Sequence, residues 1–206
     1  MHWMGISDIW TFILAVVVFL AIPGPGTFAL LTATSKGGKS GGYIALMGLI
    51  LGDQILLWLA VAGVAALLAA NPLLFKAVQY AGAVYLIWIG ISLLRPGAHP
   101  STGLIPMQVG KYFHQGLLIT VLNPKAIVFY MAFFPLFIDP QRHQGLLTFA
   151  TMAALIAMIT LIYCTGIILI GDALSNRLRS NPTIGQWLQR AAGVFLIGFG
   201  IKLGSN

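Results

Sequence analysis

Charged residues are scarce in this sequence. Only 7% of its 206 residues are Asp, Glu, Lys or Arg, whereas a soluble domain carries about a quarter of its residues as charges. Eleven basic and four acidic residues cannot cover the surface of a 22.0 kDa globule. Because 59% of the residues are hydrophobic, we predict an integral membrane protein whose surface is solvated mainly by lipid.

Residues typical of catalytic and metal sites are also scarce. The single cysteine, Cys164, cannot form an internal disulfide, and its place in an apolar stretch indicates a packing role. No histidine lies deep in an apolar run, and no His-x3-His or Cys-x2-Cys pair offers a metal site. No deep serine has a base in the same segment, which leaves a nucleophile relay unsupported. The sequence therefore predicts a protein that is not an enzyme, with no catalytic residue, cofactor or metal site.

The excess of basic residues needs a different explanation from the usual one. A net charge of +7 would suggest a nucleic-acid partner for a soluble protein. Here the basic residues lie in gaps between apolar runs, as they do in the cytoplasmic loops of membrane proteins. We therefore exclude nucleic acid as a partner.

Six apolar segments suit membrane-spanning helices, which need about 20 mostly apolar residues. Polar and turn-forming residues separate these segments. We expect an all-α polytopic fold that forms one transmembrane domain over residues 1–206. The expected spans are Ile9–Thr32, Gly42–Ala69, Leu73–Leu94, Phe113–Ile138, Leu146–Ile170 and Leu188–Leu203.

Basic residues are unevenly divided between the two sides of this arrangement. Six basic residues lie in the first, third and fifth loops. The side formed by the second and fourth loops holds Arg142, with Lys76 and Lys202 near span ends. Because cytoplasmic loops are enriched in Lys and Arg, we predict that the odd-numbered loops are cytoplasmic and that both termini face outward. The first, third and fifth loops hold Lys36, Lys39, Arg95, Lys111, Arg177 and Arg179.

The chain shows signs of two related halves. Residues 81–93 and 191–203 align at a constant offset, which sets Gly90 against Gly200 and Tyr85 against Phe195. Halves of three spans each must be inverted relative to one another, so we predict pseudo-repeats of about 1–94 and 113–206, joined by loop 95–112. Inverted halves with interrupted helices are typical of secondary transporters, whose substrate binds near the midplane.

The first and fourth spans are each interrupted near the middle, by Pro23-Gly24-Pro25-Gly26 and by Asn123-Pro124-Lys125. Because proline has no N–H, the carbonyl one helical turn before it loses its hydrogen-bond donor, and glycine permits irregular backbone dihedrals. At membrane depth such backbone must be buried in protein or line a wet cavity. The helix that restarts after each break points its N–H groups at that cavity, which suits a carboxylate, and the freed carbonyls suit an ammonium group. Prolines that only kink packed helices are the simpler alternative, but two matched breaks favour a substrate site.

Asp53 is the only acidic residue deep within a span, and Lys125 is the matching base of the fourth span. Each lies about 12 residues into its helix, which at about 1.5 Å per residue is near mid-depth. A charge at that depth costs about 2.5–3.5 kcal/mol or more. We interpret Asp53 as a proton-coupling carboxylate or a ligand for a substrate ammonium, and a structural partnership with a buried base is compatible with either. Our hypothesis is that Asp53 and Lys125 pair in one state and separate when substrate or proton arrives.

Small residues recur on one face of the second span, at Gly41, Ala45, Gly48 and Gly52. Such a stripe allows close helix packing, and Gly52 also leaves space beside Asp53. Six other polar side chains are candidates for a polar path, although local or interhelical hydrogen bonding is the simpler role for each. They are Thr27, Gln54, Thr120, Thr160, Tyr163 and Thr165.

Five motifs stand in order along nearly the whole chain. They are Pro23-Gly24-Pro25, Gly52-Asp53, Gly82-Ala83-Val84-Tyr85-Leu86, Asn123-Pro124-Lys125-Ala126 and Phe133-Phe134-Pro135-Leu136-Phe137. Together these motifs resemble those of the LysE/RhtB family of amino-acid exporters.

The resemblance implies export of amino acids from the cytoplasm across a bacterial inner membrane, by exchange for protons. The neutral-substrate branch, with its leucine and homoserine/threonine exporters, looks closer than the basic-substrate branch, and Gly41-Gly42-Tyr43 is similar to the leucine-exporter group. The loop 95–111 departs from the family in its low charge and three prolines.

The sequence thus predicts a secondary exporter of neutral amino acids, with protons and the lipid bilayer as its other partners, and it is compatible with a homo-oligomer. Three alternatives fit the sequence less well. Cation or metal efflux lacks clustered ligands, an intramembrane enzyme lacks a nucleophile, and a passive pore gives the paired breaks and buried acid no purpose. The expected site residues are Asp53, Lys125, Asn123, Pro124, Pro23, Gly24, Pro25, Gly26 and Gly52.

Overall fold

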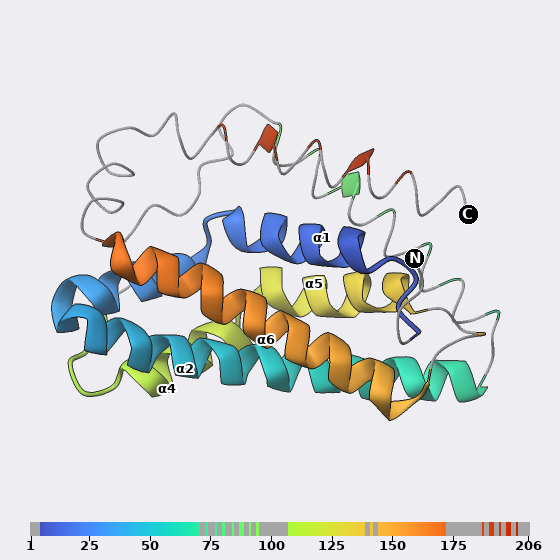
Figure 1. The fold of residues 1–206 in the computed structure, drawn as a ribbon, viewed down its shortest axis with the longest axis horizontal. Helices are drawn as coiled ribbons and strands as arrows, with labels where there is room; N and C mark the ends of the chain where they lie inside the picture. The colour runs from blue at the N-terminus through green and yellow to red at the C-terminus, as the bar shows by residue number, and fades with distance from the viewer. Residues whose placement is uncertain are drawn as a thin grey trace.

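The computed structural model describes residues 5–70, 107–138, 141 and 144–171, with single positions between 73 and 94 and between 187 and 201. Within these residues the regular structure is helical, apart from one isolated bridge between Ile6 and Ile138. The expected all-α class is therefore confirmed. The helices run roughly along the long axis of the molecule (Figure 1). They are α1 (Ile9–Ala21), α2 (Pro25–Ala70), α4 (Tyr112–Val121), α5 (Pro124–Phe133), the 3-10 helix η1 (Phe134–Phe137) and α6 (Leu146–Leu169).

The first expected span is built from α1 and the start of α2, with an interruption between them. Asp8 caps α1, because its carboxylate accepts hydrogen bonds from the N–H groups of Trp10 and Thr11. The helix ends at Ala21, and Ile22 is extended, with φ −70° and ψ 110°. Helix α2 then starts at Pro25, where a missing N–H has no consequence because the first helical N–H groups lack intrahelical partners. The break predicted by the proline–glycine motif is confirmed.

Helix α2 folds back on itself at Gly38, which has φ 63° and ψ −164°. We expected a break over residues 35–40, and the chain breaks within this range, but over a shorter stretch than predicted, because helix continues through Gly37 and restarts at Lys39. Gly38 permits the reversal because a positive φ is unstrained only for glycine. Beyond it the chain runs antiparallel to its first part, so that a Cβ atom on Gly41 would lie 2.6 Å from the carbonyl oxygen of Ala33. The second expected span is the long part of α2.

The fourth expected span is also interrupted, as predicted, between α4 and α5. Its end differs from our expectation of an α-helix to Ile138, because α5 stops at Phe133 and η1 follows. Pro135 cannot donate a hydrogen bond to the carbonyl of Met131, which breaks the α-helical pattern there. The fifth expected span is α6, within one residue of the predicted end. The third and sixth expected spans lie almost entirely outside the described residues.

The two interrupted spans lie side by side and run in opposite directions (Figure 1). The ring of Phe12 lies 5.3 Å from that of Phe137, and the ring of Phe19 lies 3.7 Å from that of Phe129. The N–H of Ser7 donates to the carbonyl of Phe137 at 3.0 Å. This antiparallel pairing brings the two breaks together. The full arrangement of two inverted halves includes the third and sixth spans and stays a prediction.

Glycines bring α2 and α4 into close contact. A Cβ atom on Gly116 would lie 2.5 Å from the carbonyl oxygen of Ala45, and one on Gly52 would lie 2.7 Å from the Cβ of Thr120. A Cβ atom on Gly48 would overlap the carbonyl oxygen of Phe113. The small-residue stripe therefore packs helices, as we expected.

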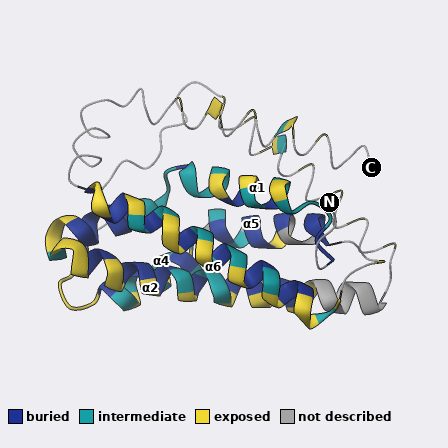
Figure 2. Ribbon diagram, viewed as in Figure 1, coloured by how far each residue is buried: buried dark blue, intermediate teal, exposed yellow. Residues whose placement is uncertain are grey.

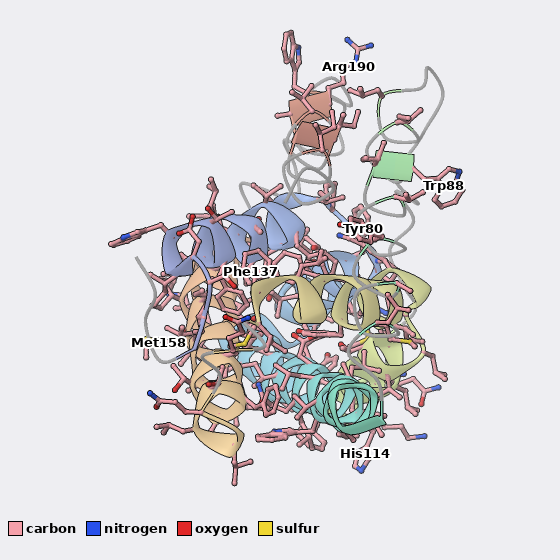
Figure 3. The ribbon with its side chains drawn as sticks, turned by 90° about the vertical axis from the view of Figure 1, so that its right-hand side faces the viewer. Tyr80, Trp88, His114, Phe137, Met158 and Arg190 are labelled. Carbon is pink, nitrogen blue, oxygen red and sulfur yellow. The ribbon has the colours of Figure 1, made fainter. Side chains whose placement is uncertain are left out.

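Many large apolar side chains are exposed on the outside of the bundle, and Figure 2 shows exposed residues recurring along α1, α2 and α6. Trp10 is 70% exposed, Leu59 64% and Ile162 66%. Among the described residues, Pro25–Gly63 and Leu146–Leu169 are long and apolar enough to cross a membrane, and α1 is a shorter apolar helix. His114 is exposed at the edge of the bundle, whereas Phe137 is buried between helices (Figure 3).

Candidate functional site

A cavity of about 70 Å³ lies where the two helix interruptions meet. Helices α1 and α4 end beside it, and α2 and α5 begin beside it. It is therefore surrounded by two helix C-termini, which carry partial negative charge, and two N-termini, which carry partial positive charge. Helix α6 closes another side with Thr160, Tyr163 and Cys164. A water molecule needs about 10–15 Å³ of such space, so the cavity has room for several.

Five of the nine predicted site residues line this cavity. They are Gly24, Gly26, Asp53, Asn123 and Lys125. They come from three parts of the chain: the first break, the middle of α2 and the second break. Their convergence follows from the antiparallel pairing of the interrupted spans and from the fold-back of α2 at Gly38.

The side chain of Lys125 reaches from the start of α5 to the end of α1. Its Nζ donates hydrogen bonds to the carbonyl oxygens of Ile22 at 2.7 Å and Phe19 at 3.2 Å. It also lies 4.5 Å from the centre of the Phe19 ring, a cation–π contact. The Phe19 carbonyl is free because its helical partner four residues on is Pro23, which has no N–H. The base predicted from the sequence thus binds carbonyls that the first break releases.

Asp53 is hydrogen-bonded to the hydroxyl of Tyr130 on α5. Our sequence reasoning missed Tyr130, which is 2% exposed. A signal was present, because a tyrosine hydroxyl deep in a span needs a polar partner, and Asp53 is the only deep acid. The Tyr130 ring packs edge-on against Phe129, whose ring stacks on Phe19. An aromatic layer therefore connects the partner of the acid with the partner of the base.

Asp53 and Lys125 share the cavity but not a hydrogen bond. Within the described part of the chain, Asp53 is bonded to Tyr130 and Lys125 to the α1 carbonyls, and no ion pair joins the two. Each of the two groups therefore has partners of its own in this structure. Their pairing in another state stays a hypothesis.

The polar backbone groups at the second break are hydrogen-bonded by residues of the same break. The Asn123 side-chain oxygen accepts a hydrogen bond from the Lys125 N–H at 3.0 Å, which caps the start of α5. The Thr120 carbonyl, which Pro124 cannot serve, accepts the Asn123 N–H at 3.1 Å. Asn123 and Pro124 therefore fix the position from which Lys125 extends.

The first break leaves backbone N–H groups without described acceptors on residues that line the cavity. Gly24 lies before α2 and has no side chain to cap it, and no described residue accepts from the N–H groups of Gly26 or Thr27. A Cβ atom on Gly24 would lie 3.5 Å from Lys125 Nζ, so glycine leaves room for the lysine. Pro23 lies in the extended segment and Pro25 starts α2. Both prolines act through the backbone that they interrupt.

One hydroxyl in the cavity wall has no partner. Thr160 is 3% exposed, and its Oγ1 forms no hydrogen bond with the described residues. A buried hydroxyl without a partner costs about 1–3 kcal/mol, so a ligand or water in the cavity would stabilise it.

The other candidates for a polar path divide into two groups. Thr27, Thr120 and Tyr163 line the cavity with Thr160. Gln54 instead donates to the Ala153 carbonyl at 3.2 Å, and Thr165 is not in the cavity wall. Gly52 lies in the α2–α4 contact rather than in the wall. Among the described residues no three His, Cys, Asp or Glu side chains gather as metal ligands.

Comparison with known proteins gives consistent results over the whole chain. The family model described as LysE type translocator matches residues 17–206. An uncharacterized membrane protein of Pseudomonas aeruginosa is 35% identical, over 97% of this chain and 96% of its own. Proteins named leucine efflux protein are 31% identical in Salmonella typhimurium, over 97% of this chain and 95% of theirs, and 32% identical in Enterobacter sp., over 98% and 97%. No solved structure matches the chain.

Proposed function

Because the chain belongs to the LysE type translocator family, we propose that it exports a neutral amino acid of the leucine type from the bacterial cytoplasm in exchange for protons. It is a membrane transporter and not an enzyme. The choice of a leucine-type substrate rests on the relatives named leucine efflux protein.

The observation that carries this proposal is a cavity that offers opposite charges at the point where two helix breaks meet. An amino acid is a zwitterion, so its site needs a partner for each charge. Lys125 and the N–H groups of Gly26 and Thr27 suit the carboxylate. Asp53 and the carbonyls at the end of α1 suit the ammonium group. Leu20 and Leu49 contribute an apolar wall for a neutral side chain.

Proton coupling is assigned to Asp53. A carboxyl group in the cavity can carry a proton in one direction and release it before the substrate ammonium binds. Tyr130 holds the carboxyl group in place during this exchange. When α5 shifts during transport, Asp53 and Lys125 come close enough to pair. This pairing accompanies the return of the transporter without substrate.

The proposed orientation places both termini outside the cell and the odd-numbered loops in the cytoplasm. The basic residues Lys36, Lys39 and Lys111 support it. A reporter enzyme fused to the C-terminus, active only on one side of the membrane, tests this orientation directly.

Efflux from vesicles preloaded with single amino acids, with and without a pH gradient, tests the function. We expect leucine efflux that is accelerated by the gradient in the wild type and insensitive to it in Asp53→Asn. The control is Asp8→Asn, because asparagine caps a helix about as well as aspartate. Equal gradient dependence in Asp53→Asn and wild type would refute the coupling role, and efflux of inorganic cations in place of amino acids would refute the substrate class.

A further inference from the structure

The end of α1 forms a binding site for an ammonium group. Two carbonyl oxygens, of Phe19 and Ile22, and the face of the Phe19 ring converge on one point, which Lys125 Nζ occupies. All three partners belong to α1 and the residue after it, and each residue has an anchor apart from Lys125: the Phe19 ring stacks on Phe129, and the Ile22 N–H donates to the Val18 carbonyl. The site would therefore accept another primary ammonium group of suitable size.

The two breaks differ in this respect. At the second break the carbonyl released by proline, that of Thr120, is bound by the Asn123 N–H. At the first break the carbonyl released by Pro23, that of Phe19, is bound by a side chain from a different helix. Only the first break thus satisfies its carbonyl with a group that can move away without unfolding the backbone.

We propose that Lys125 occupies the binding site of the substrate ammonium group in the empty transporter, and that the substrate displaces it. This inference rests on the proposed function. The incoming ammonium group binds the Phe19 and Ile22 carbonyls, and the released Lys125 binds the substrate carboxylate. Neither ammonium group is left without a partner, because the substrate takes the carbonyls that Lys125 leaves and Lys125 then binds the substrate carboxylate.

An independent feature indicates where the carboxylate lies. The Thr160 hydroxyl is buried in the cavity wall without a described partner, and the same cavity is lined by Gly26 and Thr27, whose N–H groups have no described acceptor. A carboxylate there accepts these donors and lies next to the helix that carries Lys125. The displaced lysine therefore moves between two partners inside one cavity and does not enter lipid.

Displacement explains why an amine alone would be a poor ligand. A tethered group competes at an effective concentration in the millimolar range or above, so a simple amine in solution does not displace Lys125. An amino acid does, because its carboxylate gives the lysine a new partner. The transporter would then require both charged groups of its substrate even though one pair of carbonyls binds the amine.

Thermal unfolding of the purified full-length protein in detergent tests the proposal with two probes. These are methylammonium and 3-methylbutylamine, which is leucine without its carboxyl group. In Lys125→Ala the site is vacant, and we expect saturating amine to raise the melting temperature by about 3 °C or more. The wild type and the control Lys111→Ala, which alters an exposed lysine, should not respond. No response of Lys125→Ala to either amine would overturn the proposal.

Two further variants cover the remaining explanations. Lys125→Gln keeps a hydrogen-bond donor for one carbonyl, so it serves if Lys125→Ala does not fold, and its response should lie between those of Lys125→Ala and the wild type. The double variant Lys125→Ala/Asp53→Asn tests whether the amine binds the carbonyls or simply the carboxylate. Retained amine binding supports the carbonyl site, and complete loss would assign the amine to Asp53 and overturn the displacement.

The result is separable from the substrate proposal. Amine binding to Lys125→Ala, together with absent leucine efflux by the wild type, would leave the ammonium site standing and refute the leucine assignment. Leucine efflux by the wild type with no amine binding to either Lys125 variant would support the leucine assignment and refute the ammonium site.

Discussion

The hydroxyl of Tyr130 is hydrogen-bonded to the carboxyl group of Asp53, so that α5 holds the buried acid of α2. The second residue of the same helix is Lys125, whose Nζ binds the carbonyls at the end of α1. Helix α5 therefore carries the base of the cavity and, through Tyr130, holds its acid. A shift of this one helix relative to α1 and α2 would change the partners of the acid and the base together.

Replacing Tyr130 with phenylalanine should impair transport with little effect on folding. The ring would keep its contact with Phe129, but Asp53 would lose its partner. Because a hydrogen bond to a charged group contributes about 1.5–3 kcal/mol, we expect leucine export at low concentration to fall about tenfold, measured in preloaded vesicles. Tyr43→Phe, on an exposed tyrosine, is the control. Wild-type export by Tyr130→Phe would mean that the hydrogen bond has no part in transport.

Adding a methyl group between α2 and α4 should destabilise the bundle. A Cβ atom on Gly116 would lie 2.5 Å from the carbonyl oxygen of Ala45, which is backbone and cannot move aside. We expect Gly116→Ala to lower the free energy of unfolding by about 1–3 kcal/mol, measured as a lower melting temperature. Gly63→Ala is the matched control, since nothing lies within 4 Å of its added Cβ. Equal melting temperatures for the two variants would argue against this helix contact.

Removing the cap of α5 should disturb the position of Lys125. Asn123→Ala deletes the acceptor for the Lys125 N–H, at a cost of about 1 kcal/mol. We expect a lower export rate and a small drop in melting temperature. Asn123→Ser, which restores a capping oxygen, should recover most of both. If alanine and serine behave alike, the cap is not what matters at this position.

The only cysteine of the chain reports on the cavity without any mutation. Cys164 is 7% exposed and lines the cavity wall. We expect saturating leucine to slow its reaction with N-ethylmaleimide several-fold, measured by mass spectrometry, because the substrate fills the space through which the reagent arrives. Cys164→Ala gives the background. Labelling at the same rate with and without leucine would place the substrate elsewhere.

The helix breaks and the deep charges were predictable because their causes are local. Pro23 and Pro25 remove N–H groups from the first span whatever surrounds them, and Pro124 does the same in the fourth. The depth of Asp53 and Lys125 follows from counting residues along a helix. These features need no knowledge of how the helices pack.

The partners of those charges were not predictable, because they depend on which helices meet. Tyr130 becomes a partner of Asp53 only when α5 packs against α2, and Lys125 reaches the Phe19 carbonyl only when the interrupted spans run antiparallel. The tightness of the turn at Gly38 was not predicted, for a different reason. Six consecutive polar or small residues indicate a loop, but two glycine-faced helices can approach so closely that one residue suffices to reverse the chain.

That turn has a mechanical consequence. Tyr112 packs against Gly37 and Gly41, and the amino group of Lys36 donates to the Met107 carbonyl at 3.1 Å, so both arms of the hairpin are clamped near its tip. We therefore expect the two arms to move together with α4. The Ile22 carbonyl, in the extended segment between α1 and α2, is bound across the bundle by the Lys125 amino group, which can change its partner. We expect the described bundle to bend at this extended segment and not at the clamped hairpin tip.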